Sequence, residues 1–307
     1  MTEKSYPKVT VVGAGNVGAN AALLLLLKDL ANVALVDVVP GVAEGKALDI
    51  MHMRSNERFG PRICGSEDYA ITAGSDIVVV TAGVPRKPGM TREDLLSVNS
   101  GIVRSVLDAA LPASPDAIYV FVTNPLDVMV NLAFSLAGLP ANRLFGMGGV
   151  LDTARFIYAI AQETGAEPGD IQAMVIGAHG EAMLPLPRLA TVAGRPLPEV
   201  VDAAAIQRIV EATVQGGAAV VNLLKTGSAF YAPASSIARM VAEILSPSGQ
   251  TLSVCARLAG QYGIEGTHIC VPVRLGKAGV EEIVELPLNP DELAALQASA
   301  AAIKSQL

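Results

Sequence analysis

The chain has 307 residues, of which 51% are hydrophobic and 17% are charged, and its formal net charge is -7. This acidic balance excludes general nucleic-acid binding, which needs a basic face, and the longest strongly apolar run, 21–27, is far too short to cross a bilayer. The N-terminus lacks the apolar segment of a secretory signal and the three cysteines are scattered, so we expect a cytoplasmic protein with reduced thiols and no metal site.

The first half alternates short β-branched runs with helical patterns. Strands are predicted at 9–12, 33–38, 77–80 and 118–122, and a helix is predicted at 16–30. Apolar runs without alternation are typical of strands buried on both faces, and helices between such strands imply parallel pairing. Because parallel crossovers are nearly always right-handed, we expect a doubly wound α/β sheet of the Rossmann type.

The second half is predicted to be an α+β unit. Its expected elements are strands at 173–176, 253–256, 268–273 and 279–286 and helices at 203–224 and 234–245. Asn289 followed by Pro290 and two acids indicates the start of a last helix. We expect the boundary between the halves near Gly146, with domains at 1–146 and 147–307.

A glycine-rich turn lies between the first predicted strand and the first helix. The segment Val11-Val12-Gly13-Ala14-Gly15-Asn16-Val17-Gly18 contains GxGxxG, and Asp37 stands at the end of the second strand. The glycines allow a tight turn and let backbone N–H groups approach a pyrophosphate at a helix N-terminus. The acid can bind a ribose diol and repels a 2′-phosphate, which favours NAD over NADP. The expected contacts are Gly13, Gly15, Asn16, Val17, Gly18 and Asp37; a glycine turn without a ligand is the alternative.

The loop 84–92 concentrates positive charge on an acidic chain. Arg86, Lys87 and Arg92 lie in this Pro/Gly-punctuated connection, directly after the predicted strand 77–80. Such a loop is suited to meet a small anion and to close over it. The sequence therefore predicts a carboxylate or a phosphate as the substrate.

Further patches carry side chains suited to catalysis. Asn124 precedes a proline at the carboxyl end of a predicted strand, where ligands of such folds bind. Asp152 and Arg155 share one helix face, where an arginine can clamp a carboxylate. His179 ends a strand between glycines, and an imidazole exchanges protons near neutral pH. A turn residue, a surface ion pair and a buried structural histidine are the respective alternatives.

Taken together, these motifs resemble the malate/lactate dehydrogenase family, most closely its bacterial, lactate-dehydrogenase-like malate branch. The resemblance is carried by GAGNVG, TAGVPRKPGMTR, VTNP, LDTAR and GAHGE, in this order along nearly the whole chain. It implies NAD-dependent oxidation of (S)-malate to oxaloacetate, a place in the tricarboxylic acid cycle, and a homotetramer or homodimer. No nucleic-acid or membrane partner is expected.

The resemblance also implies a role for each candidate residue. His179 is expected to accept and donate the proton, while Asp152 orients its ring and stabilises the imidazolium. Arg155 is expected to bind the C1 carboxylate of the substrate, and Arg92 to polarise the reacting carbonyl. Asn124 is expected to bind the substrate oxygen and to help place the nicotinamide.

Three positions complete the site that the resemblance implies. Asn99 and Val122 are expected to contact the cofactor, and Arg86 stands where arginine indicates malate and glutamine indicates lactate. An L-lactate or other 2-hydroxy acid dehydrogenase is the alternative, but a methyl group would leave the Arg86 charge unpaired in a closed site. A more distant alternative, a non-catalytic dinucleotide-binding protein, does not explain His179, Asp152 and the arginines together.

Overall fold

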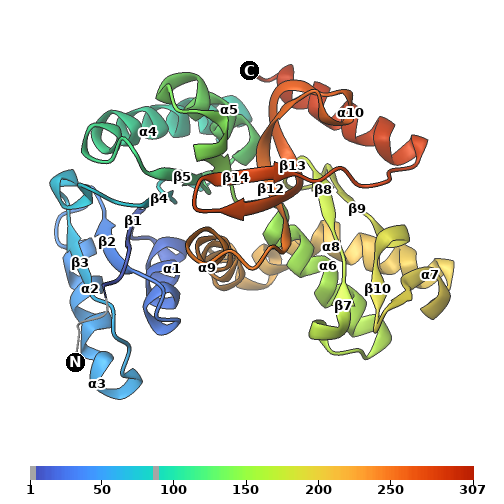
Figure 1. Cartoon of the computed structure of the whole chain (residues 1–307), viewed down its shortest axis with the longest axis horizontal. Coiled ribbons are helices and arrows are strands. Elements are labelled where there is room, and N and C mark those ends of the chain that lie inside the picture. The colour runs from blue at the N-terminus through green and yellow to red at the C-terminus, as the bar shows by residue number, and fades with distance from the viewer. Residues whose placement is uncertain (1–4, 86–89) are drawn as a thin grey trace.

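Strands and helices alternate along the first half of the chain, as predicted. The computed structural model describes residues 5–85 and 90–307, apart from the side chain of Arg92. Its first strands are β1 (Lys8–Val12), β2 (Asn32–Val36), β3 (Ile63–Ser66), β4 (Ile77–Val80), β5 (Ile118–Phe121) and β6 (Leu144–Gly146). The helices among them are α1 (Asn16–Leu27), α2 (Val42–His52), α3 (Arg54–Glu57), α4 (Arg92–Ala113) and α5 (Leu126–Ala137). These strands pair in parallel in the order β3-β2-β1-β4-β5-β6, which confirms the doubly wound sheet (Figure 1).

The second half continues the same sheet with antiparallel strands. Its strands are β7 (Ile171–Gln172), β8 (Val175–Gly177), β9 (Met183–Pro185), β10 (Thr191–Val192), β11 (Arg195–Pro196), β12 (Thr251–Ala259), β13 (Glu265–Gly276) and β14 (Gly279–Ile283). Its helices are α6 (Gly149–Thr164), α7 (Leu197–Val200), α8 (Ala203–Leu224), α9 (Tyr231–Leu245) and α10 (Pro290–Lys304). The order runs on from β6 through β12-β13-β8-β9, β14 pairs with β13, and β7, β10 and β11 form a small separate sheet. The two halves join where Gly146 of β6 pairs with Cys255 of β12.

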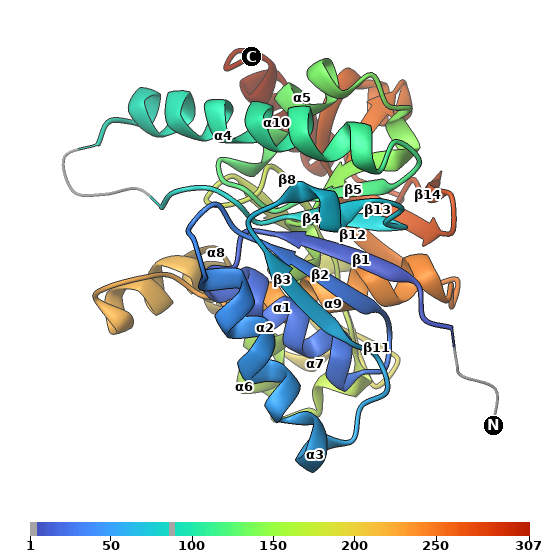
Figure 2. The same cartoon turned by 90° about the vertical axis from the view of Figure 1, so that its left-hand side faces the viewer.

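Helices cover both faces of the parallel strands, so the strands are buried on both sides. Figure 2 shows α4 and α5 over one face and α1, α2 and α9 under the other. In β4, Ile77 and Val79 belong to the apolar cluster of one face, and Val78 and Val80 belong to that of the other face. Burying each such side chain contributes about 1.5–3 kcal/mol, which explains the unbroken apolar runs of the sequence.

Differences from the predicted elements have local causes. The first helix ends at Leu27 and not at residue 30, and Asp29 beyond it adopts a positive φ of 54°. The edge strand β3 was not predicted, because Gly65 weakens its strand pattern. A Cβ at Gly65 would lie 2.2 Å from the backbone of Ala43, so this glycine lets α2 pack on the strand. Within the described residues, none of the helices has the length and hydropathy needed to cross a membrane.

Candidate active site

The turn after β1 is shaped to receive a pyrophosphate. A Cβ on Gly18 would lie 1.9 Å from the carbonyl oxygen of Gly13, so only glycine lets α1 begin this close to the turn. Gly13 itself has a φ of 99°, and a Cβ there would lie 2.8 Å from the nitrogen of Ala82 after β4. Gly15 caps α1 without a side-chain hydrogen bond, and its Cβ position has no neighbour within 4 Å among the described residues. The first N–H groups of α1 are therefore directed at a position that suits an anion.

Asp37 follows β2 and faces the same turn. Its Oδ2 accepts the N–H of Ala14 at 2.7 Å, and its Oδ1 accepts the N–H of Val39 at 3.0 Å. Each oxygen retains a lone pair, so the carboxylate can accept hydrogen bonds from a ribose diol while the backbone holds it in place. Lys46, which the sequence analysis did not single out, donates its Nζ to the carbonyl of Ala14 at 2.6 Å.

A cavity of about 710 Å³ lies where the two halves meet, at the carboxyl end of β5. It brings together three predicted residues from separate elements: Asn124 before α5, Arg155 on α6 and His179 after β8. Glu181 and the exposed end of α8, at Val221, also line it. Groups remote in sequence therefore share one space, which the sequence analysis expected.

Asp152 connects His179 to Arg155 at the wall of this cavity. Its Oδ2 lies 2.8 Å from Nδ1 of His179, and its Oδ1 accepts a hydrogen bond from Nη1 of Arg155 at 3.2 Å. The Asp152 side chain is 1% exposed, whereas those of His179 and Arg155 are 15% and 19% exposed. Because Nδ1 of the neutral ring carries the hydrogen that it donates to the carboxylate, Nε2 has a free lone pair and is the atom that can accept a proton.

Opposing effects act on the His179 imidazole, and the net result is a raised pKa. Burial lowers the pKa of His179, but the charge and hydrogen bond of Asp152, with the charge of Asp127, raise it more. The Arg155 guanidinium acts in the opposite direction. The protonated ring is thus more stable in this site than in a free histidine, which suits a group that both donates and accepts a proton.

Asn99 ties the start of the cationic loop to the segment that carries Asn124. Its Oδ1 accepts the N–H of Val84 at 2.9 Å, and its Nδ2 donates to the carbonyls of Val84 at 3.2 Å and Asn124 at 2.7 Å. The side chain of Asn99 is buried, while that of Asn124 is exposed. The structure thus shows a backbone-holding role for Asn99, and the expected cofactor contacts of Asn99 and Val122 stay predictions.

The two loop arginines are the least described part of the predicted site. Arg86 lies outside the described residues, and for Arg92 only the backbone, at the start of α4, is described. A capping box of Thr91 and Asp94 fixes this start of the helix. The roles assigned to both arginines therefore stay predictions.

Models of one protein family match both halves of the chain. Residues 7–146 match the model described as lactate/malate dehydrogenase, NAD binding domain, and residues 149–307 match lactate/malate dehydrogenase, alpha/beta C-terminal domain. The chain belongs to the lactate/malate dehydrogenase family. This membership confirms the predicted resemblance, the fold class, the NAD cofactor and the assignment to an oxidoreductase family.

Individual members of the family resemble the chain over almost its full length. The malate dehydrogenase of Roseiflexus castenholzii is 47% identical over 301 residues, which cover 98% of this chain and 97% of that protein. The crystal structure of Cryptosporidium parvum malate dehydrogenase has a TM-score of 0.94 at 40% identity and covers 98% of both chains. The lactate dehydrogenase of the same organism, solved with lactic acid and β-nicotinamide adenine dinucleotide, has a TM-score of 0.93 at 36% identity, covering 98% of this chain and 97% of that chain. Malate and lactate members of the family thus share one backbone, and side chains must decide the substrate.

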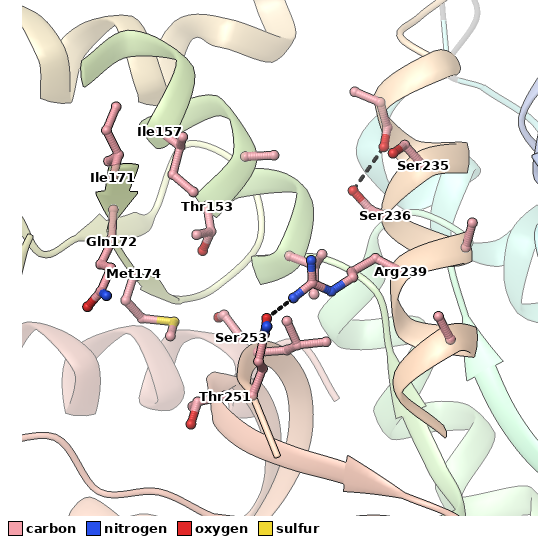
Figure 3. A pocket seen from close by; sticks show the side chains of 18 of the residues that line it. Thr153, Ile157, Ile171, Gln172, Met174, Ser235, Ser236, Arg239, Thr251 and Ser253 are labelled. Carbon is pink, nitrogen blue, oxygen red and sulfur yellow. Dashed lines mark hydrogen bonds between the residues drawn. The ribbon is translucent and has the colours of Figure 1, made fainter. Parts of the chain in front are cut away.

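A second cavity lies away from the predicted site residues. It measures about 930 Å³ and lies among α6, β7, α9 and β12, with Thr153, Gln172 and Arg239 in its wall (Figure 3). None of the predicted site residues that the structure describes line it. Asn124, Arg155 and His179 line the smaller cavity instead.

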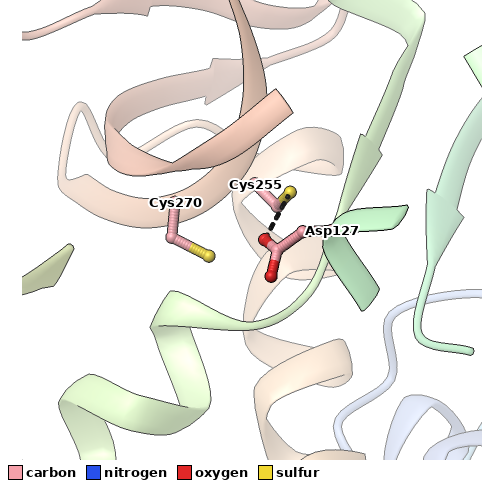
Figure 4. Close-up of side chains that lie close together, drawn as sticks. All are labelled: Asp127, Cys255 and Cys270. Atoms are coloured by element: carbon pink, nitrogen blue, oxygen red, sulfur yellow. Dashed lines mark hydrogen bonds between the residues drawn. The ribbon is translucent and has the colours of Figure 1, made fainter. Parts of the chain in front are cut away.

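One residue next to the predicted catalytic histidine was missed by the sequence analysis. Asp127, three residues after Asn124, is 7% exposed, and its Oδ2 accepts the backbone N–H of His179 at 2.9 Å. Figure 4 shows its carboxylate beside the thiol of Cys255, with Cys270 close by. The only signal in the sequence was an acid two residues after the Asn-Pro pair, and this is explained equally well as a favourable charge at a helix N-terminus.

Proposed function

We propose that this protein is an NAD-dependent malate dehydrogenase that interconverts (S)-malate and oxaloacetate. The observation that carries the proposal is the double contact of Asp152, whose carboxylate holds His179 and Arg155 at one cavity wall. A 2-hydroxy acid needs an acid–base group for its hydroxyl and a cation for its neighbouring carboxylate, and these two residues supply both. The relatives named malate dehydrogenase support a dicarboxylate as the substrate.

The turn after β1 and the ends of the following strands form the proposed NAD site. When bound there, NAD supplies the acceptor for the hydride that leaves C2 of malate. The residues proposed to hold it are Gly13, Gly15, Asn16, Val17, Gly18, Asp37, Asn99, Val122 and Asn124. The open position over Gly15 and the spare lone pairs of Asp37 support this assignment.

The proposed proton transfer takes place at Nε2 of His179. In malate oxidation the neutral ring accepts the hydroxyl proton, and in oxaloacetate reduction the imidazolium returns a proton to the carbonyl oxygen. Asp152, 2.8 Å from Nδ1, stabilises the imidazolium and keeps the ring in one orientation, as the aspartate of a hydrolase triad does.

Three arginines and Asn124 are proposed to bind the dicarboxylate. Arg155 binds the C1 carboxylate, Asn124 binds the reacting oxygen, Arg92 polarises the carbonyl, and Arg86 binds the second carboxylate. Closure of the loop 84–92 would exclude water and strengthen each of these charge interactions. Pyruvate would leave Arg86 without its partner, a loss of about 2–5 kcal/mol for a desolvated charge.

We also propose an organisation and a location for the enzyme. Residues 1–146 form the NAD-binding domain and residues 147–307 the catalytic domain, and the protein assembles as a homotetramer or homodimer. Large exposed apolar side chains, such as Leu48, Tyr158 and Leu223 at 59%, 63% and 82% exposure, support an assembly. Unbridged Cys255 and Cys270, which face each other, support a reducing cytoplasm, and malate chemistry supports a role in the tricarboxylic acid cycle.

A single assay separates the candidate activities. Oxidation of NADH and of NADPH is followed by absorbance with oxaloacetate or pyruvate as the acceptor, and H179A serves as the catalytic control. We expect the highest kcat/KM with oxaloacetate and NADH, and loss of this activity in H179A. A preference for pyruvate would favour the lactate alternative, and no activity with any pair would favour the non-catalytic one.

A further inference from the structure

A buried carboxylate lies directly behind the proposed catalytic histidine. Asp127 lies in the first turn of α5, and its two oxygens accept hydrogen bonds from the His179 backbone N–H at 2.9 Å and from the Cys255 thiol at 3.4 Å. We infer that Asp127 is a positioning residue, which holds the main chain of His179 and places a second negative charge beside its ring. The inference rests on the proposed function of His179 as the acid–base group.

The backbone of His179 is held from two sides of the turn that carries it. β8 ends at Gly177, and the N–H of the next residue, Ala178, donates to Oγ of Ser299 on α10 at 3.0 Å. The N–H of His179 donates to Asp127 on α5. The ring is held separately, through Nδ1, by Asp152 on α6. Asp127 therefore provides a contact that neither of the other two anchors can replace.

Two cysteines shape the other side of the carboxylate. Cys255 and Cys270 oppose each other across β12 and β13, are 0% and 1% exposed, and lie with Asp127 so that their polar atoms fall within 4.8 Å of one another. Burial above all raises the pKa of Cys255, and the pKa of Cys270 is also raised although its hydrogen bond with Cys255 lowers it. Both thiols are thus protonated at neutral pH, and Cys255 acts as a hydrogen-bond donor to Asp127.

The packing leaves little freedom for this arrangement to shift. A Cβ on Gly148, just before α6, would lie 3.1 Å from Sγ of Cys270 and 3.2 Å from Cβ of His179. The glycine therefore allows the thiol and the histidine to approach the start of α6 closely. We expect a change in the Asp127 side chain to act on His179 through their direct hydrogen bond, because a packed interior leaves little room for other adjustment.

The charge of Asp127 is unfavourable for the fold but suited to the reaction. Burial raises the pKa of Asp127 to about 6, against the lowering effects of His179 and Cys255, and the nearby charge of Asp152 raises it further. The charged and titratable groups that face the pair are Asp152 and Arg155 on α6, Cys255 on β12 and Cys270 on β13. A carboxyl with a raised pKa stabilises the fold below its unfolded pKa of about 3.9, and this stabilisation is lost as the pH rises through about 6. Above that pH the ionised group opposes folding, which is typical of a functional site.

The test replaces the carboxylate with a neutral side chain of the same shape. In D127N the amide oxygen can still accept the His179 N–H, but the negative charge is lost. We expect kcat for oxaloacetate reduction to fall about tenfold, because the imidazolium loses one of the two nearby negative charges that stabilise it. The KM for oxaloacetate should stay within about twofold, because Arg155 is untouched. The melting temperature above pH 7 should not fall, because an unfavourable buried charge has been removed.

Titration of the histidine ring provides a readout that a purely structural role would not move. The only other imidazoles belong to His52 and His268, so the Cε1–H resonance of His179 can be assigned by comparison with H179Q. We expect the pKa of His179 to be lower in D127N than in the wild type, because one of the two nearby negative charges is gone. D291N, which removes an exposed acid from the first turn of α10, is the matched control and should match the wild type.

The outcomes distinguish this inference from the proposed function. An unchanged His179 pKa in D127N, or a kcat within twofold of the wild type, would overturn the role of Asp127. A lower melting temperature and a smaller active fraction without a pKa change would show that Asp127 is only structural. A wild-type protein without activity toward oxaloacetate would refute the proposed function, and the titration would still decide whether Asp127 acts on His179.

Discussion

Replacement of Asp152 by asparagine tests the central contact of the proposed mechanism. The change keeps the shape but removes a carboxylate 2.8 Å from Nδ1 of His179, in a setting where the two side chains are 1% and 15% exposed. A hydrogen bond to a charged group is worth about 1.5–3 kcal/mol. The attraction between opposite charges about 4 Å apart at an effective dielectric constant of about 20 is about 4 kcal/mol. These bounds predict a loss of roughly tenfold to a thousandfold in kcat/KM.

The assay for D152N follows oxaloacetate reduction from pH 5 to pH 9. Asp152 is the first of the groups that raise the pKa of His179, so the protonated ring should be lost at a lower pH in the variant. Reduction needs that protonated ring, and its rate should therefore decline at a lower pH than in the wild type. D49N, an exposed acid on α2, is the control. A D152N rate within twofold of the wild type, with an unchanged pH profile, would refute the reasoning.

Substitutions at three further positions test other parts of the site. R86Q should shift kcat/KM from oxaloacetate toward pyruvate by roughly thirtyfold or more, and an unchanged ratio of the two values would contradict the role of Arg86. G18A would place a Cβ 1.9 Å from the carbonyl oxygen of Gly13, so we expect NADH affinity measured by fluorescence to fall more than tenfold or the protein not to fold. G217A places its Cβ 3.5 Å from Nη2 of Arg155, an ordinary contact, and should stabilise α8 by up to about 1 kcal/mol in thermal unfolding. The larger G217L should instead raise the KM for oxaloacetate, and equal KM values for both variants would show that this glycine does not shape the Arg155 pocket.

Most of the fold could be predicted because its signals are local. The apolar run of β4 indicates a buried strand, and the glycines before α1 indicate a tight turn. Both features are observed as expected. The capping signal at Asn289 likewise marks the observed start of α10. The edge strand β3 was not predicted, because its Gly65 is needed for the close packing of α2 on the strand. Such a tertiary contact leaves no local pattern in the sequence.

In the candidate site, too, contacts between residues close in sequence could be predicted, and contacts that depend on tertiary packing could not. Asp152 and Arg155 are three residues apart on one helix, so their ion pair could be predicted from helix geometry. The contact between Asp152 and His179 joins residues whose proximity depends on the packing of α6 against β8, and only the family resemblance suggested it. Asp127 could not be recognised at all, because its partners lie 52 and 128 residues along the chain.

The pairing of Gly146 with Cys255 limits how the enzyme can be divided into separate fragments. Leu144 and Phe145 of β6 are fully buried, and the strand that covers the far edge of β6 is supplied by β12, from late in the chain. A fragment cut after residue 146 would present an uncovered, apolar strand edge, the kind of template on which chains aggregate. The nucleotide-binding half is therefore not expected to be transplantable as an independent module, and any fusion or split-protein design must keep β12 with it.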